Sequence, residues 1–212
     1  MSLKDDIFAD YQAFARCKTK TNWPRVILMT VRSLGFRVVL LHRIGHWHRR
    51  RRRRLIAGVC DRLIWSCGAD LNTGAEIGAG FRLPHPIGVV VGSGVKIGQR
   101  VRILQGATLG GEGGKAREDG QTQPSVGDDV IIGAGAALLG PIRVGNRVKI
   151  GANAVVNTDL PDDCTAVGVP ARVVRLAGKR VRLLDRGGEL ADILNHTLKR
   201  LARLEDQPGT GA

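Results

Sequence analysis

Few side chains in this chain of 212 residues could bind a metal or attack an acyl group. The four cysteines are Cys17, Cys60, Cys67 and Cys164. They show no CxxC pair and no histidine at zinc-finger intervals, so the sequence predicts no metal site. We interpret them as buried thiols of a cytoplasmic protein, and covalent acyl transfer through Cys60 or Cys67 is disfavoured.

Positive charge is the second chemical feature. The net charge is +14, and six consecutive arginines occupy positions 49–54. Such a run cannot be buried, but it could meet nucleic acid, anionic lipid or an acidic polysaccharide precursor, or it could simply be solvated. No nucleic-acid-binding motif accompanies it, so nucleic acid is a disfavoured partner. Residues 26–41 carry apolar side chains at helical spacing between arginines, which predicts either a helix on a membrane surface or one packed on the protein.

A six-residue period fills the centre of the chain. Small or aliphatic residues recur at Leu71, Ile77, Leu83, Val89, Val95, Val101 and Ala107, and again at Val126, Ile132, Leu138, Val144, Ile150 and Val156. Glycine often follows them. This period predicts a mainly β protein, a parallel β-helix of triangular cross-section in which each hexad supplies one short strand and one corner. Glycines would adopt the corner conformations, and the narrow interior explains why only 4% of the residues are aromatic.

The flanking segments differ from this repeat. We expect residues 1–66 to form a basic helical region, 67–176 the β-helix, and 177–212 a C-terminal helix with a loose tail. The helix is indicated by Leu190, Ile193, Leu194, Leu198, Leu201 and Leu204. The repeat slips by one residue across 110–125, where glycine and charge are abundant, so this stretch must leave the prism as a loop.

Four segments carry a resemblance to a known family. They are Asp70-Leu71-Asn72, Leu83-Pro84-His85-Pro86-Ile87-Gly88, Ala107-Thr108-Leu109-Gly110-Gly111 and Val167-Gly168-Val169-Pro170-Ala171-Arg172. Over roughly residues 65–176 the chain resembles the hexapeptide-repeat acyltransferases, most closely the serine acetyltransferase branch. Residues 37–44 are more similar to exopolysaccharide acetyltransferases of the colanic acid type. The resemblance implies a left-handed coil, acetyl-CoA as co-substrate, and a homotrimer that could pair into a dimer of trimers.

The family's catalytic residues map onto two positions here. The resemblance implies His85 as general base and Asp70 as its partner, because a hydroxyl must lose its proton as it attacks the thioester. It implies an acetyl-CoA site formed by small and basic residues, namely Gly110, Gly111, Ala134, Lys149, Ala152 and Arg172. Backbone N–H groups near Gly110 and Gly111 could hold the oxyanion. The acceptor would contact Pro84, Thr122 and Gln123.

The chain differs from the serine acetyltransferases at two single positions and in one three-residue segment. Those enzymes carry an Asp before the base, a Glu eight residues after it and an Arg-His-Pro segment, where this chain has Pro84, Ser93 and Thr122-Gln123-Pro124. The charged clamp for an amino acid is therefore missing, and unpaired buried charges are costly. We expect an uncharged acceptor, a sugar of a polysaccharide or its precursor. A serine or homoserine-like acceptor is the alternative, and a non-catalytic scaffold that binds CoA or a partner is the second.

The location follows from the N-terminus. Met-Ser-Leu-Lys-Asp-Asp lacks the pattern of a secretion signal, so the sequence predicts a cytoplasmic enzyme, with peripheral contact at the inner membrane surface through the basic N-terminal region as a further hypothesis.

Overall fold

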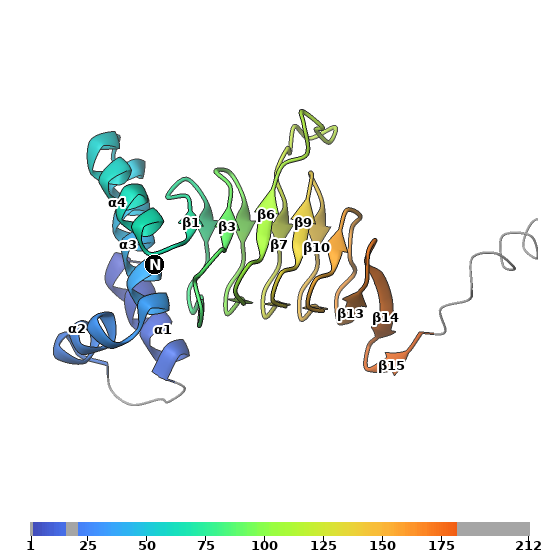
Figure 1. Ribbon diagram of the computed structural model, residues 1–212, viewed down its shortest axis with the longest axis horizontal. Helices are drawn as coiled ribbons and strands as arrows, with labels where there is room; N and C mark the ends of the chain where they lie inside the picture. The colour runs from blue at the N-terminus through green and yellow to red at the C-terminus, as the bar shows by residue number, and fades with distance from the viewer. Residues whose placement is uncertain (1, 16–20, 182–212) are drawn as a thin grey trace, which may run out of the picture. The chain divides into compact units, whose positions relative to one another are not determined.

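The structure, a computed structural model, describes residues 2–15 and 21–181. The helices and strands belong to one compact unit, Met1–Arg180. Four helices come first: α1 (Leu3–Ala15), α2 (Trp23–Arg32), α3 (Leu34–Arg50) and α4 (Arg54–Ser66). They gather at one end of a stack of short strands (Figure 1). The C-terminal helix predicted at 190–204 lies outside the described residues.

Local sequence explains where these helices begin and end. Asn22 caps α2 by accepting a hydrogen bond from the backbone N–H of Arg25 at 3.1 Å, and Ser33 caps α3 in the same way through Phe36 at 3.2 Å. The chain turns after α3 at Arg52, whose φ of 60° ends the helix. None of the described helices is both long enough and apolar enough to cross a membrane.

The strands form three flat faces of a parallel coil. They are β1 (Asp70–Leu71), β2 (Glu76–Ile77), β3 (Val90–Val91), β4 (Lys96–Ile97), β5 (Arg102–Ile103), β6 (Thr108–Gly110), β7 (Ser125–Val126), β8 (Ile131–Ile132), β9 (Ala137–Leu139), β10 (Arg143–Val144), β11 (Lys149–Ile150), β12 (Val155–Val156), β13 (Cys164–Val167), β14 (Arg172–Leu176) and β15 (Lys179–Arg180). Sheet A has the order β1-β3-β6-β9-β12, sheet B β10-β7-β4-β2, and sheet C β15-β14-β13-β11-β8-β5. The predicted parallel β-helix is confirmed, with an antiparallel end at β14 and β15.

The register between coils reveals an insertion that the sequence pattern concealed. Leu71 pairs with Val91, twenty residues later, whereas Val91 pairs with Leu109, eighteen residues later. Val89 and Val91 are both fully buried, because each face turns two side chains inward. The six-residue count from Leu71 to Ala107 therefore looks unbroken although its phase shifts by two residues. The extra residues lie in 84–88, the segment that carries His85.

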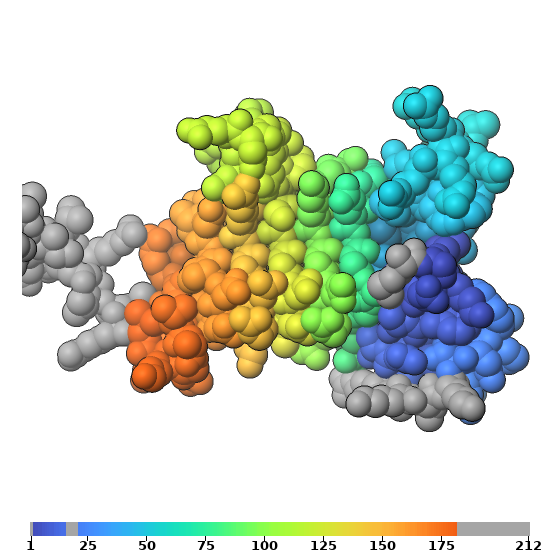
Figure 2. Space-filling model, turned by 180° about the vertical axis from the view of Figure 1, so that it is seen from behind, coloured from blue at the N-terminus to red at the C-terminus, as the bar shows by residue number. Residues whose placement is uncertain are grey.

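The insertion that forms the loop is also longer than the one-residue slip inferred from the repeat. Leu109 pairs with Leu138, twenty-nine residues later, so a coil of eighteen residues gains eleven. The predicted slip of one residue is wrong, because it was counted from Ala107. Ala107 and Leu109 both point inward, and the register with Leu138 runs through Leu109. The segment between β6 and β7 projects from the stack as a loop in Figures 1 and 2, while Gly110 and Ser125 at its ends belong to the strands.

The glycines that follow the inward aliphatic residues serve close packing between coils. Gly98 and Gly145 do not have positive φ values. A Cβ atom built at either glycine would lie 2.3 Å from a carboxylate oxygen of the next coil, on Asp128 or Asp162. The expectation that these glycines supply corner conformations is wrong. Positive φ occurs elsewhere at the corners, in Gly80 and Gly106 and in charged residues such as Arg147.

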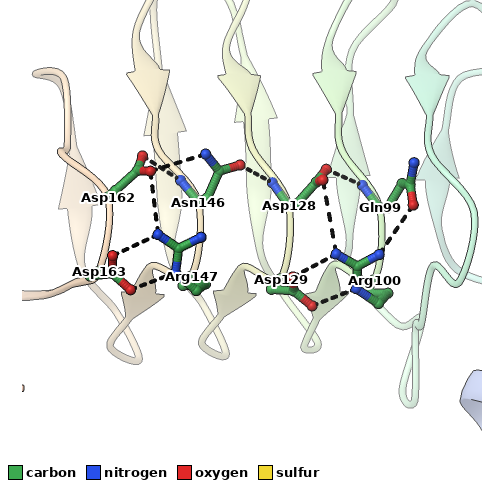
Figure 3. Close-up of polar contacts among 8 residues, drawn as sticks. All are labelled: Gln99, Arg100, Asp128, Asp129, Asn146, Arg147, Asp162 and Asp163. Carbon is green, nitrogen blue, oxygen red and sulfur yellow. Dashed lines mark hydrogen bonds and ion pairs between the residues drawn. The ribbon is translucent and has the colours of Figure 1, made fainter. Parts of the chain in front are cut away.

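A polar ladder locks the corner between sheets B and C (Figure 3). Its side-chain oxygens accept backbone N–H groups of the preceding coil, Asp128 from Gln99 at 2.7 Å, Asn146 from Asp128 at 2.8 Å and Asp162 from Asn146 at 2.9 Å. Beside it lie two ion pairs, Arg100 with Asp129 and Arg147 with Asp163. The hydrogen bond from Arg147 holds the pKa of Asp163 below its usual range, and Arg100 does the same for Asp129. These pairs are exposed, so their main effect is to fix the register of the coils.

A buried ion pair joins the helices to the first coil. Arg43 of α3 donates to both carboxylate oxygens of Asp10 of α1, at 2.8 and 3.1 Å, and the two side chains are 5% and 1% exposed. Arg43 also donates to the carbonyls of Ile77 and Gly78, and Asp10 accepts from the N–H of Phe81 at 2.8 Å. Two helices and the first coil therefore share one set of charge-assisted hydrogen bonds.

His42 makes this junction sensitive to pH. Burial lowers the pKa of His42 to about 3, and the neighbouring Arg43 adds to this effect. In the unfolded chain His42 becomes protonated near pH 6.5, whereas in the folded chain it stays neutral until about pH 3. The free energy of unfolding therefore falls as the pH drops from 6.5 toward 3. Between pH 6.5 and 5, where the carboxylates of the ladder stay ionised, urea titrations should show a falling free energy of unfolding. His42→Leu should flatten that slope, and an unchanged slope in the variant would contradict this role.

Candidate active site

His85 lies at the corner where the chain passes from sheet C to sheet A, which we call the base corner. The segment 84–88 is held between coils, since Gly88 donates to the carbonyl of Gly68 at 2.7 Å and Gly106 donates to that of Ile87 at 3.0 Å. Pro86 is buried, while the His85 side chain is exposed. The two extra residues of this coil thus present an imidazole to solvent on a fixed backbone.

Asp70 stands beside the same corner, one coil earlier. It is the first residue of β1, it pairs in register with Val90, and its side chain is exposed. In the described part of the chain, neither Asp70 nor His85 makes a side-chain hydrogen bond, so both are free to contact a substrate or each other. The structure therefore brings the predicted base and its predicted partner to one corner.

Four of the predicted acetyl-CoA residues border the base corner. Ala134 and Ala152 lie in the turns of this corner on later coils. Successive coils pack so closely there that a Cβ at Gly133 would lie 2.5 Å from the backbone nitrogen of Ala152. Lys149 lies in β11 and Arg172 in β14, both in sheet C. Small turns beside basic residues suit a thin pantetheine arm that ends in phosphates.

Of the remaining predicted residues, Pro84 lies beside His85 in segment 84–88, and the other four lie at the opposite ends of the sheet A strands. Gly110 ends β6, and Gly111, Thr122 and Gln123 follow it, at the corner between sheets A and B, which we call the loop corner. A Cβ at Gly111 would lie 2.7 Å from Nε2 of Gln123, and one at Gly92 would lie 3.2 Å from its Oε1. Among the described residues, this buried Oε1 has no hydrogen-bond partner. One chain alone therefore does not bring these four residues to His85.

Ion pairs hold the loop against the two coils that follow it in the stack. Arg117 donates to Asp159 at 2.9 Å and to the carbonyl of Pro141 at 3.2 Å, and Asp119 pairs with Arg143. Gln121 donates to the carbonyl of Gln123 at 2.7 Å. The position of Gln123 is thus set by contacts that are far apart in the sequence.

Sequence reasoning missed Gly35, at the start of α3. A Cβ there would lie 1.8 Å from the carbonyl oxygen of Leu83 and 3.2 Å from that of Pro84. Helix α3 therefore packs directly on the backbone that leads into His85. A lone glycine near a helix start gives no sequence signal of such a contact.

Gly35→Ala should harm both stability and catalysis. Alanine in a helix normally stabilises by about 1 kcal/mol relative to glycine, but here the overlap must displace α3 or the 83–85 backbone. We expect a loss of about 1–3 kcal/mol in urea unfolding and a reduced kcat. Gly58→Ala in α4 is the matched control, since its Cβ would meet nothing within 4 Å, and it should be neutral or stabilising. Equal behaviour of the two variants would contradict the proposed packing role.

The comparisons with known proteins address the family. The bacterial transferase hexapeptide (six repeats) family matches residues 124–158. Serine acetyltransferase of Synechococcus elongatus is 38% identical over 177 residues, covering 82% of this chain and 71% of the relative. The chain belongs to the serine acetyltransferase family. Soybean serine acetyltransferase complexed with serine has a TM-score of 0.71 at 38% identity, covering 82% of this chain and 70% of that one. A serine acetyltransferase complex with CoA has a TM-score of 0.69 at 37% identity, with the same shares.

Membership of the serine acetyltransferase family confirms one prediction and corrects another. The chain is an acyl-CoA-dependent O-acyltransferase, as predicted. The prediction of a sugar acceptor is wrong, because the relatives that share about four-fifths of this chain are serine acetyltransferases. That prediction rested on the missing charged clamp and on the resemblance of residues 37–44 to exopolysaccharide enzymes, and neither outweighs a match to serine acetyltransferases over four-fifths of the chain. Among the described residues, no group of three or more His, Cys, Asp or Glu could hold a metal.

Proposed function

We propose that this protein is a serine O-acetyltransferase. The co-substrate is acetyl-CoA. The observation that carries the proposal is the continuous match to serine acetyltransferases over the helices and the coil together, at 34–41% identity in the sequence and structure comparisons. The position of His85 and Asp70 at one exposed corner supports it. We also infer a left-handed coil, as the family resemblance implies.

The chemistry follows from the base corner. The serine hydroxyl attacks the thioester carbonyl carbon of acetyl-CoA while its proton passes to the imidazole of His85. Asp70 acts as a positioning residue that favours the reactive tautomer and stabilises the imidazolium. The tetrahedral intermediate expels the CoA thiolate, which takes up a proton, and O-acetylserine is released. Ala134 and Ala152 would let the pantetheine arm approach, and Lys149 and Arg172 would face its phosphates.

A trimer would complete the site. His85 and Gln123 lie at opposite ends of the sheet A strands in one chain, so a neighbouring prism must bring its loop to the base corner for both to contact one acceptor. Apolar residues exposed on α4, among them Leu55, Val59 and Leu63, are candidates for contact between chains. Co-expressing His85→Ala chains with chains whose 112–120 loop is shortened tests this arrangement. Mixed trimers should regain activity that neither variant has alone, and the absence of recovery would contradict a shared site.

The acceptor clamp of this chain differs from the family pattern described above. Ser93 lies between Gly92 and Gly94, both close to Gln123, so two of the three uncharged replacements meet at the loop corner, while Pro84 lies beside His85 at the base corner. Neutral hydrogen-bonding groups hold an amino acid more weakly than charged ones. We therefore expect a KM for serine that falls when charge is restored in Gln123→His or Ser93→Glu.

The deciding experiment measures CoA release from acetyl-CoA with serine, homoserine and glycans as separate acceptors. Saturable turnover with serine, with O-acetylserine identified by mass spectrometry, would support the proposal. Turnover only with another acceptor, or none with serine at any concentration, would refute it.

A further inference from the structure

Helix α2 presents an apolar stripe to solvent. Trp23, Ile27 and Val31 follow one another at a spacing of four residues and are 48%, 63% and 69% exposed, and Leu28 beside them is also exposed. In α2 only Val26 is buried. Four-residue spacing places side chains on one face of a helix, so these residues form a continuous strip rather than scattered contacts.

A groove continues this apolar surface. It has a volume of about 390 Å³ and lies between α2 and the neighbouring helices α1 and α3. Eight of its nine lining residues are apolar, and Thr30 is the exception. Thr30 donates its hydroxyl proton to the carbonyl of Val26 at 2.9 Å, so even this residue offers little polarity. An exposed apolar surface of this kind marks an interaction site.

The same helical region is strongly cationic. Residues 21–66 contain eleven arginines and a single acid, Asp61. Asp61 pairs with Arg49, and Arg43 is neutralised by Asp10, but all five arginines from Arg50 to Arg54 are exposed. The α3–α4 turn that carries them stands out from the helices in Figure 2. In the described part of the chain, no carboxylate forms an ion pair with these five.

This combination selects one kind of partner. Aliphatic side chains and a tryptophan enter the boundary between headgroups and acyl chains, while arginines meet lipid phosphates, each cation contributing about 1 kcal/mol near an anionic surface. A second copy of the chain would bring together two chains of net charge +14, which repulsion opposes. Nucleic acid would satisfy the arginines but would leave the stripe in water.

We propose that helix α2 docks this protein on the surface of a membrane rich in anionic lipid, with the 50–54 arginines as the electrostatic attractor. The docking is independent of the acceptor specificity proposed above. It would hold the enzyme at a membrane surface through one apolar strip, with release by high salt.

Vesicle co-sedimentation of the full chain tests this inference. We expect the protein to bind vesicles of equal parts phosphatidylglycerol and phosphatidylcholine and to remain free with phosphatidylcholine alone. Ile27→Gln/Val31→Gln, which removes two exposed apolar side chains without changing charge, should weaken binding by at least about tenfold. Arg50→Gln/Arg54→Gln should weaken binding at low salt, and the difference from wild type should shrink as salt is raised. Leu176→Gln in β14 is the matched control, since this leucine is 43% exposed on another element, and its binding should equal wild type.

Three results would overturn the proposal. One is equal binding to both vesicle compositions, and another is unchanged binding by Ile27→Gln/Val31→Gln. The third is a change in oligomeric state of that variant in sedimentation velocity with no change in vesicle binding, which would show that a second copy covers the stripe. Unchanged acetyl-CoA turnover in all variants will confirm that they are folded.

Discussion

His85→Ala should lower kcat for acetyl transfer by about 10²- to 10⁴-fold, because the hydroxyl then has no positioned base. Acetyl-CoA affinity should change little, since the predicted CoA residues lie on later coils. Steady-state kinetics with serine, together with a direct binding measurement for CoA, separates the two effects. The acid limb of the kcat/KM profile, which reports the base in the free enzyme, should disappear in the variant.

Two controls belong with this prediction. His48→Ala removes a histidine of α3 that is not part of the base corner, and it should retain wild-type turnover. Asp70→Asn should lower kcat less than His85→Ala and move the acid limb of the profile, as expected for a residue that acts through the histidine. Full activity in His85→Ala would exclude the imidazole as base. A profile unmoved in Asp70→Asn would exclude Asp70 as its positioning partner.

Asp10→Ala should cost about 3–5 kcal/mol of the free energy of unfolding, the largest stability effect that we expect. The substitution leaves the Arg43 guanidinium buried without its counter-ion, and it removes the acceptor for the N–H of Phe81. Urea unfolding at fixed protein concentration measures the loss.

Asp6→Ala on the same helix is the control, because Asp6 is only partly buried and should cost less than about 1 kcal/mol. Asp10→Asn should fall between the two, since an amide oxygen still accepts from Phe81 but carries no charge for Arg43. A loss below about 1 kcal/mol in Asp10→Ala would show that water or a rearranged side chain replaces the carboxylate.

Much of the fold can be predicted from the sequence, because the patterns that specify it involve residues close together in the chain. A coil with an inward aliphatic residue on every face repeats at short range, so the period and the low aromatic content predict the parallel β-helix without any knowledge of distant contacts. The capped helices are equally local. His85 and Asp70 were found through motif resemblance, which works because their segments lie inside the repeat.

Tertiary structure alone decided the rest. The two-residue insertion in segment 84–88 was invisible because Val89 and Val91 are both buried, so an inward residue stood at each counted position. Likewise, the steric role of Gly35 depends on a carbonyl nearly fifty residues away. No periodicity encodes such an approach.

The division of the site follows the same logic. Sequence motifs grouped His85 with Gly111 and Gln123, yet strand direction places them at opposite ends of sheet A, because the chain enters each strand at the base corner and leaves it at the loop corner. Residue types and spacing thus determined the coil, and motif resemblance pointed to the candidate base. Which residues can meet at one substrate depends on coil register and chain packing, which arise only when distant segments are folded together.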